Sequence, residues 1–261
     1  MIFIDTHCHL FWNDFDHDLD DAIARAKAEG VTRIIVPGTN VETSMLAQGI
    51  AHRFEGVYFT AGVHPHDAKD LPGDTFARIE ALAADPLCVA IGEIGLDYHY
   101  DFCPKEQQHE ALRSQLALAK SLGLPVVLHN RESDEDLLDI CREQQDGRLR
   151  GQFHCFSSSN DYAQRVLDAG FHLSFTGNVT YKKSTLGDAV AVVPDDRLLV
   201  ETDAPFMTPA PFRGKRNEPA RIPLIAQRFA ELRGQDLAHV AACTTANAVA
   251  LFRLGEMRPG G

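Results

Sequence analysis

The sequence lacks the features of an exported or membrane-inserted protein. No apolar run approaches the roughly 20 residues that a helix needs to span a bilayer. The opening MIFIDTHCHL has neither the basic region nor the long apolar run of a signal peptide. The 6 cysteines are scattered without a CxxC pair, which is typical of reduced thiols in a chain of this size. We therefore expect a cytoplasmic protein without disulfides or membrane association, and nothing in the sequence indicates an obligate protein partner.

The sequence also has fewer basic than acidic residues. The 25 Lys and Arg residues face 37 Asp and Glu residues, which gives a formal net charge of −12. This balance argues against a broad electrostatic grip on nucleic acid, because such a grip needs clustered basic side chains. A small phosphate-handling site is still compatible with it, because bound divalent cations reverse the local sign of the charge. The basic cluster Arg213, Lys215 and Arg216 is either a solvated loop or a lid over a phosphodiester.

A glycine-rich dinucleotide-binding motif is absent, whereas short β-branched apolar runs are frequent. Eight such runs recur at intervals of roughly 25 to 35 residues, each followed by a stretch of helical character. This number of units in a chain of 261 residues predicts an α/β fold of the (β/α)₈ TIM-barrel type, as a single domain over residues 1–261. An open doubly wound sheet is the alternative, which the missing GxGxxG motif opposes. The predicted strands are 2–7, 32–38, 57–64, 87–95, 125–131, 151–156, 171–177 and 197–203.

Helix ends are marked in three of the stretches between these runs. Residues 19–30 and 111–123 have apolar positions at helical spacing and each ends in glycine. Residues 133–147 open with Ser133 and acidic residues, which suit a helix N-terminus. We expect a helix in each.

Side chains that can bind metal end several of the apolar strands. In a barrel, catalytic groups gather at the carboxyl ends of the strands, so these side chains should lie close together. Each histidine taken alone is more often a hydrogen-bonded core or loop residue. That explanation gives no reason why several such side chains should end separate strands at the same side of the barrel. The residues are Asp5, His7 and His9 on the first strand, His64 and His66 on the third, Glu93 on the fourth, His129 on the fifth, His154 on the sixth, and Glu201 and Asp203 on the eighth.

The pattern predicts a divalent-metal hydrolase. His7 and His9 are two apart on an extended segment and point the same way, so both can bind one cation. Mixed imidazole and carboxylate donors suit Zn, Mn, Fe or Mg. The predicted ligands are His7, His9, Glu93, His129, His154 and Asp203.

Six ligands exceed what one catalytic ion with an open position needs, so we expect two ions that share a bridging carboxylate. Glu93 is the best candidate for the bridge. Asp203 can bind one ion and also take a proton from the attacking water. Glu201, on the same side of the strand as Asp203, is expected to orient a ligand or water.

Further residues near these ligands have two readings each. His64 either is a solvated residue of a turn shaped by Pro65 or contacts the phosphate or leaving group of the substrate. Arg131 either clamps a phosphate or pairs with Glu132 or Asp134. Asp97 and Tyr98 are expected to be loop or substrate-wall groups. Cys8 and Cys155 are expected to pack inside the barrel instead of binding metal.

Taken together, these motifs resemble the TatD family of metal-dependent hydrolases, a branch of the amidohydrolase superfamily. The stretch at 209–222 is similar to the family's final signature, so the resemblance covers nearly the whole chain. The blocks that carry it are HCH at 7–9, GVHPH at 62–66, GEIGLDY at 92–98, LHNRE at 128–132, HCFS at 154–157 and ETDAPF at 201–206.

The resemblance implies a (β/α)₈ barrel with deoxyribonuclease activity, commonly 3′→5′ on single strands. It places one metal at His7, His9, Glu93 and Asp203, and a second metal at Glu93, His129 and His154. Other amidohydrolases often bridge their metals with a carboxylated lysine. Here the fourth strand supplies Glu93 instead, as in the TatD branch.

Three classes of function follow. The first is phosphodiester hydrolysis at single-stranded DNA or RNA ends, which the phosphate-directed residues His64 and Arg131 favour. The second is a two-metal hydrolase of a carboxyl ester, lactone or amide, including deacylation of aminoacyl-tRNA, because the same centre can direct water at a carbonyl carbon. The third is a non-enzymatic barrel for partner binding or metal storage, which a complete ligand set opposes.

Overall fold

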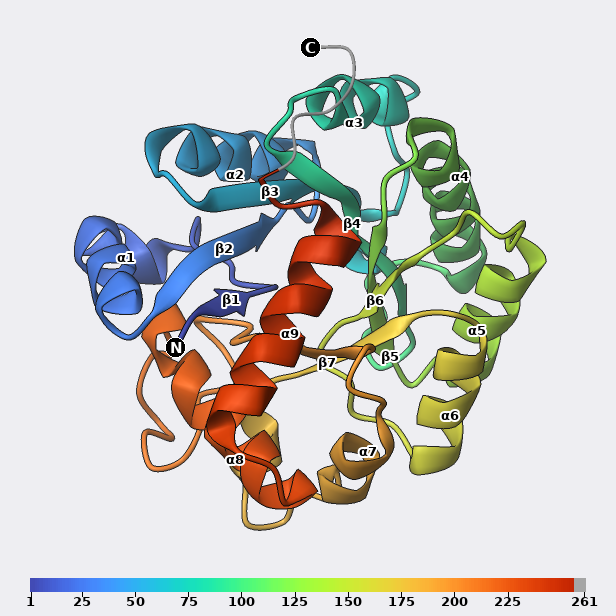
Figure 1. The fold of residues 1–261 in the computed structure, drawn as a ribbon. Coiled ribbons are helices and arrows are strands. Elements are labelled where there is room, and N and C mark those ends of the chain that lie inside the picture. The colour runs from blue at the N-terminus through green and yellow to red at the C-terminus, as the bar shows by residue number, and fades with distance from the viewer. Residues whose placement is uncertain (256–261) are drawn as a thin grey trace. The chain divides into compact units, whose positions relative to one another are not determined.

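A computed structural model describes residues 1–255, and Figure 1 shows their helices and strands. The chain divides into two compact units, which are each described by themselves. Of the residues described, the first unit comprises Met1–Val36 and Cys155–Ala250, and the second comprises Pro37–His154 with residues 251–255. Among the described residues no helix is both long and apolar enough to cross a membrane.

The first unit contains both ends of the strand series. Strands β1 and β2 pair in parallel, as do β7 and β8. Its strands are β1 (Phe3–Asp5), β2 (Val31–Pro37), β7 (His172–Phe175) and β8 (Leu198–Val200). Its helices are η1 (Asn13–Phe15), α1 (Leu19–Ala28), α6 (Asn160–Asp168), η3 (Gly177–Thr180), α7 (Gly187–Val192), η4 (Pro219–Arg221), α8 (Ile222–Arg233) and α9 (Leu237–Phe252).

The second unit contains the middle strands, which pair in parallel from β3 through β6. Strand β4 is buried at every position, as expected for a parallel strand covered on both faces. The strands are β3 (Val57–Ala61), β4 (Cys88–Asp97), β5 (Val126–Arg131) and β6 (Gly151–Phe153). The helices are α2 (Val41–Arg53), η2 (Pro65–Asp67), α3 (Thr75–Ala83), α4 (Lys105–Leu122) and α5 (Asp134–Glu143).

The strands follow one another in the order β1 to β8. This order confirms the α/β class and excludes the doubly wound alternative, in which the strand order departs from the sequence order. Several predicted strands are too long: the first was placed at 2–7, but β1 ends at Asp5, and the last was placed at 197–203, but β8 ends at Val200. The polar residues at these ends therefore lie just beyond the hydrogen-bonded ladder. The single domain over 1–261 stays a prediction.

The predicted helix ends are largely correct. Helix α4 ends directly before Gly123, and α1 ends shortly before Gly30. Ser133 precedes α5, but its side chain does not cap the helix. Its hydroxyl donates instead to the carbonyl of Leu96 at 3.0 Å and to Oδ1 of Asn130 at 2.7 Å. The acidic first turn of α5 is present as predicted, where it opposes the positive end of the helix dipole.

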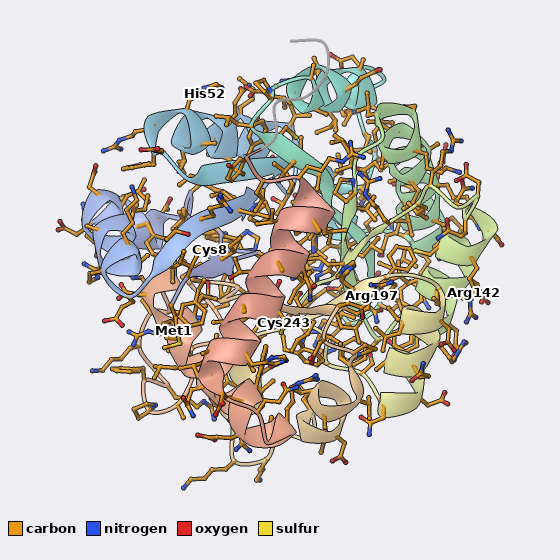
Figure 2. The ribbon with its side chains drawn as sticks, in the orientation of Figure 1. Met1, Cys8, His52, Arg142, Arg197 and Cys243 are labelled. Atoms are coloured by element: carbon orange, nitrogen blue, oxygen red, sulfur yellow. The ribbon has the colours of Figure 1, made fainter. Side chains whose placement is uncertain are left out.

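All 6 cysteines are free in the structure, and their reduced state stays a prediction. Figure 2 labels two of them, Cys8 and Cys243. Cys8 has no exposed surface, and burial raises the pKa of its thiol well above the usual value. It is fully enclosed by the chain, although it lies between two predicted ligands in the sequence.

Candidate metal centre

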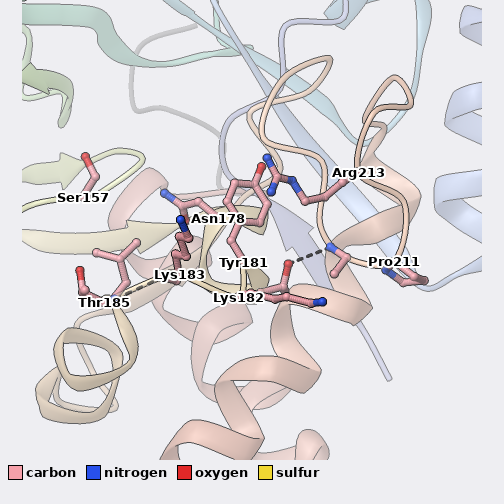
Figure 3. A pocket seen from close by; sticks show the side chains of 12 residues that line it. Ser157, Asn178, Tyr181, Lys182, Lys183, Thr185, Pro211 and Arg213 are labelled. Carbon is pink, nitrogen blue, oxygen red and sulfur yellow. Dashed lines mark hydrogen bonds between the residues drawn. The ribbon is translucent and has the colours of Figure 1, made fainter.

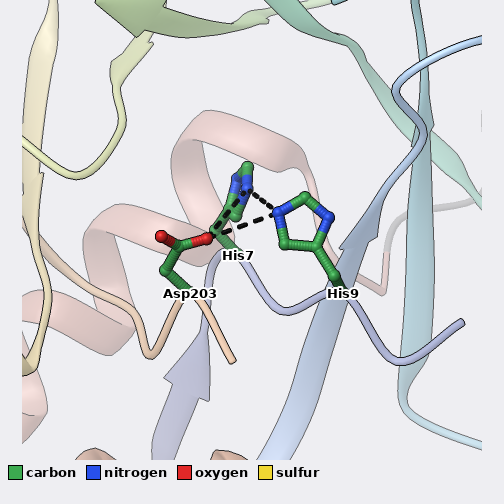
Figure 4. A group of neighbouring side chains, drawn as sticks. All are labelled: His7, His9 and Asp203. Carbon is green, nitrogen blue, oxygen red and sulfur yellow. Dashed lines mark hydrogen bonds and ion pairs between the residues drawn. The ribbon is translucent and has the colours of Figure 1, made fainter. Parts of the chain in front are cut away.

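The first unit brings together His7, His9 and Asp203, which we call the HHD group (Figure 4). The Nε2 atoms of the two histidines are 3.1 Å apart. Oδ1 of Asp203 lies 3.3 Å from Nε2 of His9 and 3.8 Å from Nε2 of His7. All three residues are buried. The segments after β1 and β8 therefore direct three donor atoms at one point.

Asp5 and Thr202 connect these two segments. Thr202 donates its N–H to Oδ1 of Asp5 at 2.9 Å and its hydroxyl to Oδ2 at 2.5 Å. The N–H of His7 also donates to Oδ1 of Asp5, at 3.3 Å. Burial raises the pKa of Asp5 to about 8 against the lowering effect of these hydrogen bonds. Asp203 follows with φ of 53°, a left-handed conformation that Asp tolerates better than most residues.

Glu201 is fully buried, and chain donors contact both of its oxygens. The N–H of Cys155 donates to Oε1 at 2.5 Å, and the hydroxyl of Ser174 donates to Oε2 at 2.7 Å. Thr6 adds a longer hydrogen bond to Oε2 at 3.5 Å. These contacts fit an orienting role better than a role in which the carboxylate exchanges protons with substrate.

The second unit brings together Glu93, His129 and His154, which we call the EHH group. Oε1 of Glu93 lies 2.9 Å from Nε2 of His154 and 3.1 Å from Nδ1 of His129. The two ring nitrogens are 3.3 Å apart. A third histidine, His64, places its Nε2 3.4 Å from the same carboxylate oxygen. Three imidazoles thus surround Oε1 of Glu93.

Asp97, which the sequence predicts only as a loop or substrate-wall residue, orients this group. Its Oδ2 is 3.1 Å from Nε2 of His129 and 2.7 Å from Nε2 of His66. Burial by itself raises the pKa of Asp97, but hydrogen bonds from His129, the Tyr100 N–H and His66 outweigh it and hold the pKa well below its usual range. The period-two alternation from Glu93 along β4 was the available signal, because it puts Asp97 on the same face.

Gly95 allows β4 to pass close to β5 between these two carboxylates. It pairs with His129 in the parallel ladder. A Cβ atom added at Gly95 would lie 2.0 Å from the carbonyl oxygen of His129, so a side chain is excluded there. The close approach positions the His129 ring between Glu93 and Asp97.

The structure of the His-Pro-His turn agrees in part with both interpretations of His64. The N–H of His66 donates to Nδ1 of His64 at 3.1 Å, and Pro65 lies between them, so the turn is present as predicted. His64 is nevertheless buried instead of solvated. Burial and the charge of His129 lower the pKa of His64 to about 4, so its ring is neutral at pH 7.

Arg131 is exposed and stacks over Tyr100, with its guanidinium carbon 4.8 Å from the ring centre. Its proposed acidic partners are occupied elsewhere: Glu132 contacts His99 at 2.6 Å, and Asp134 accepts from Asn130 at 2.6 Å. Within residues 1–255 the guanidinium of Arg131 has no ion pair, so it can contact a ligand.

The basic cluster divides between two environments. Arg216 is held by Asp18, with contacts of 2.6 and 2.8 Å, and cannot act as a lid. Arg213 is exposed and lies 4.0 Å from the ring centre of Tyr181. Lys215 is exposed, and its carbonyl accepts from the hydroxyl of Thr208 at 2.7 Å.

Both donor groups fit a divalent ion. Nitrogen and oxygen ligands at the distances typical of tetrahedral zinc lie roughly 3.3 Å from one another. The HHD group spans 3.1 to 3.8 Å and the EHH group 2.9 to 3.3 Å. Asp195, His239 and Cys243 form a further group in the first unit, but there Asp195 already pairs with the guanidinium of Arg233.

Comparison with known proteins gives a consistent result. Residues 4–253 match the family described as TatD related DNase. The chain is 44% identical to the Bacillus subtilis protein named uncharacterized metal-dependent hydrolase YabD, over 97% of this chain and 100% of that protein. It is 40% identical to the Cronobacter sakazakii protein named 3′-5′ ssDNA/RNA exonuclease TatD, over 95% of this chain and 97% of that protein.

Solved structures agree. The crystal structure of the TatD homologue YjjV from Escherichia coli superposes with a TM-score of 0.91 at 32% identity, covering 97% of this chain and 98% of that one. An uncharacterized amidohydrolase from Saccharomyces cerevisiae superposes with a TM-score of 0.83 over 97% of this chain and 100% of that one; at 19% identity it supports the fold alone. With the strand order, these likenesses confirm the (β/α)₈ barrel class.

Proposed function

Because the chain belongs to the TatD-related DNase family of metal-dependent hydrolases, we propose that it removes nucleotides from the 3′ ends of single-stranded DNA or RNA. Relatives at about 40% identity carry the name 3′-5′ ssDNA/RNA exonuclease. The observation that carries the proposal is the presence of two imidazole–carboxylate groups, each spaced for one divalent ion. The alternative of carboxyl-ester, lactone or amide hydrolysis uses the same donors, so substrate screening decides between them.

In the proposed site the HHD group would hold one ion and the EHH group a second, and the family resemblance implies that Glu93 would be a ligand of both. The ions, once bound, neutralise charge on the reacting phosphate and make the attacking water more acidic. Asp203 holds its Oδ1 toward both histidines of its group and is the proposed proton acceptor. The metal's identity and the number of ions are part of the proposal.

The remaining residues have positioning and binding roles. Asp97 accepts from the outer nitrogen of His129 and fixes the ring's orientation, an arrangement that commonly strengthens a ligand histidine. Glu201 holds the backbone of Cys155 in place. We assign His64, neutral and beside Glu93, and Arg131, open to a ligand, to contacts with the substrate's phosphate. A cytoplasmic location and the lack of an obligate partner stay predictions.

Metal content is measured first. We expect up to two divalent ions per purified chain and loss of activity after chelation, with recovery when Zn, Mg, Mn or Fe is restored. Full activity of verified metal-free protein would contradict the proposal.

Direction of attack is measured next on single-stranded oligonucleotides labelled at either end. A 5′ label should move through a ladder of products shortened one nucleotide at a time, while a 3′ label should appear at once as mononucleotide. Circular single strands serve as the control and should persist. Cleavage of circles at a comparable rate would refute exonuclease action, and turnover of carboxyl esters alone would favour the alternative.

A further inference from the structure

A pocket of about 660 Å³ lies in the first unit, between the loops that follow β7 and β8 (Figure 3). Its size falls within the range of small-molecule and cofactor sites. Asn178 and residues 180–186 form one wall, and Ala210, Pro211 and Arg213 contribute to another. None of these residues belongs to the HHD group, so the pocket is an additional feature of the unit.

The pocket is basic in a chain that is strongly acidic. Lys182, Lys183 and Arg213 line it, and no Asp or Glu is among its lining residues. Both lysines are exposed, and neither has an ion pair among the described residues. The lining also includes hydroxyl and amide donors such as Ser157 and Asn178. Lysine, arginine, hydroxyl and amide groups are the usual partners of phosphate oxygens in nucleic acid complexes.

The two walls are in contact, so the pocket is a built feature of the fold. A Cβ atom added at Gly177 would lie 2.1 Å from the carbonyl oxygen of Met207 and 2.6 Å from the nitrogen of Pro209, which only glycine permits. The N–H of Ala210 donates to the hydroxyl oxygen of Thr180 at 2.8 Å. These contacts hold the loop after β8 against the loop after β7.

The loop after β8 also connects the pocket to the HHD group, because Asp203 lies near its start. Phe206 closes a turn on Asp203 through an N–H···O bond of 2.9 Å, and the loop then runs to Arg213, which covers Tyr181. Asp203 of the HHD group and Arg213 of the pocket thus lie on one loop, and Arg213 contacts Tyr181 of the opposite wall.

We propose that this pocket binds backbone phosphates of the single strand on the 5′ side of the phosphodiester that is cleaved. The inference rests on the proposed exonuclease function. At a 3′ end only one nucleotide lies beyond the scissile bond, so every further phosphate belongs to the 5′ side. A basic pocket on the loop that carries a proposed metal ligand thus retains the strand while the terminal nucleotide leaves.

The test uses the holoenzyme and a nuclease-resistant phosphorothioate decamer of thymidine, with binding followed by fluorescence anisotropy at several salt concentrations. Lys182→Gln with Lys183→Gln should lower the slope of log affinity against log salt by roughly 1.4, the value for two lost phosphate contacts on a single strand. Lys182→Arg with Lys183→Arg should restore the slope. Lys27→Gln with Lys69→Gln, which removes the same charge from two exposed lysines outside the pocket, should leave the slope in place.

Turnover gives an independent readout. KM for an unmodified decamer should rise on the order of 10-fold in the double glutamine variant, with kcat nearly constant, because the lost contacts position the strand. The dinucleotide dTpdT, which has no phosphate beyond the scissile one, should be affected much less. An unchanged salt slope and KM would overturn the proposal, as would an equal loss on dTpdT.

The result also separates this inference from the proposed function. Wild-type protein that binds the decamer through the two lysines but cleaves no strand refutes the exonuclease and retains the pocket. Wild-type protein that cleaves normally while the lysine variant matches it in binding and KM refutes the pocket and retains the exonuclease. Failure of the wild type both to bind and to cleave refutes both.

Discussion

The two compact units hold their donor groups in different ways. In the first unit His7, His9 and Asp203 follow strand ends, and their positions depend on backbone contacts such as those that Asp5 accepts from Thr202 and His7. In the second unit Glu93 and His129 are on the strands themselves, and a second carboxylate, Asp97, fixes the ring. The first group therefore depends on the path of the chain and the second on a side-chain network, so single substitutions should discriminate between them.

The largest effect is expected for Glu93→Gln, which keeps the size of the side chain and removes its charge. If Glu93 serves both ions, metal content should fall in both groups and kcat by at least about 10²–10³-fold, the cost of removing one preorganised electrostatic element. His129→Ala should remove mainly the ion of the second unit. Metal analysis and turnover on a small phosphodiester measure both outcomes. A folded Glu93→Gln protein with two ions and near-normal turnover would assign the bridge to another group, with Asp203 the next candidate.

A smaller effect is expected for Asp97→Asn, which weakens the support of His129 without removing a ligand. Metal affinity or activity should fall about 10–100-fold, as is usual when the outer partner of a ligand histidine is changed. Occupancy of the HHD group should not change. Asp101→Asn, an exposed change in the following loop, is the matched control. Equal metal affinity in the two variants, measured by competition with a chelating dye, would show that Asp97 does not position His129.

The smallest effect concerns stability. In the first unit Arg216 and Arg25 donate hydrogen bonds to the carboxylate of Asp18. These bonds, that of Arg216 first, outweigh the opposite effect of burial and hold the pKa of Asp18 well below its usual range. A depressed folded-state pKa adds stability above the unfolded pKa of about 4, and this stability is lost as the pH falls further. Arg216→Gln should therefore lower the free energy of unfolding by about 1 kcal/mol at pH 7, because several charges form one network.

The difference between Arg216→Gln and the wild type should shrink below about pH 4, where Asp18 becomes protonated in the unfolded chain. Urea titrations at pH 7 and pH 3.5 measure it. Arg142→Gln, which breaks an exposed pair with Asp139 in the second unit, is the control and should change stability less at both pH values. Figure 2 labels Arg142. A constant difference at both pH values would show that Arg216 stabilises by packing alone.

The sequence analysis could select the predicted donors because residue type and strand position coincide at several of them together. His7, Glu93, His129 and Asp203 each follow or end an apolar run, and the structure places them in two compact groups. Orienting groups are harder to predict, because an acidic residue after a strand is common in loops. Asp97 is recognisable only once β4 is known to extend to it, two residues beyond the predicted end at 95.

The basic pocket also could not be predicted from the sequence, because its residues lie in irregular loops. Lys182 and Lys183 come from an irregular loop, where neither period two nor helical spacing indicates what a side chain faces. The sequence did indicate Arg213, but in a cluster with Arg216, and these two residues have different partners in the structure. Positions that depend on contacts between distant loops cannot be read from local patterns.

The hydrogen bonds between Asp5 and Thr202 have a consequence for synthesis of the chain on the ribosome. They join residues 197 positions apart, and the HHD group forms around the same connection. At the usual synthesis rate of 5–20 residues per second, Asp203 is made roughly 10–40 s after His7 and His9. The EHH group becomes complete in sequence within that interval, when His154 is made. A nascent chain therefore has the donors for the ion of the second unit before those for the ion of the first.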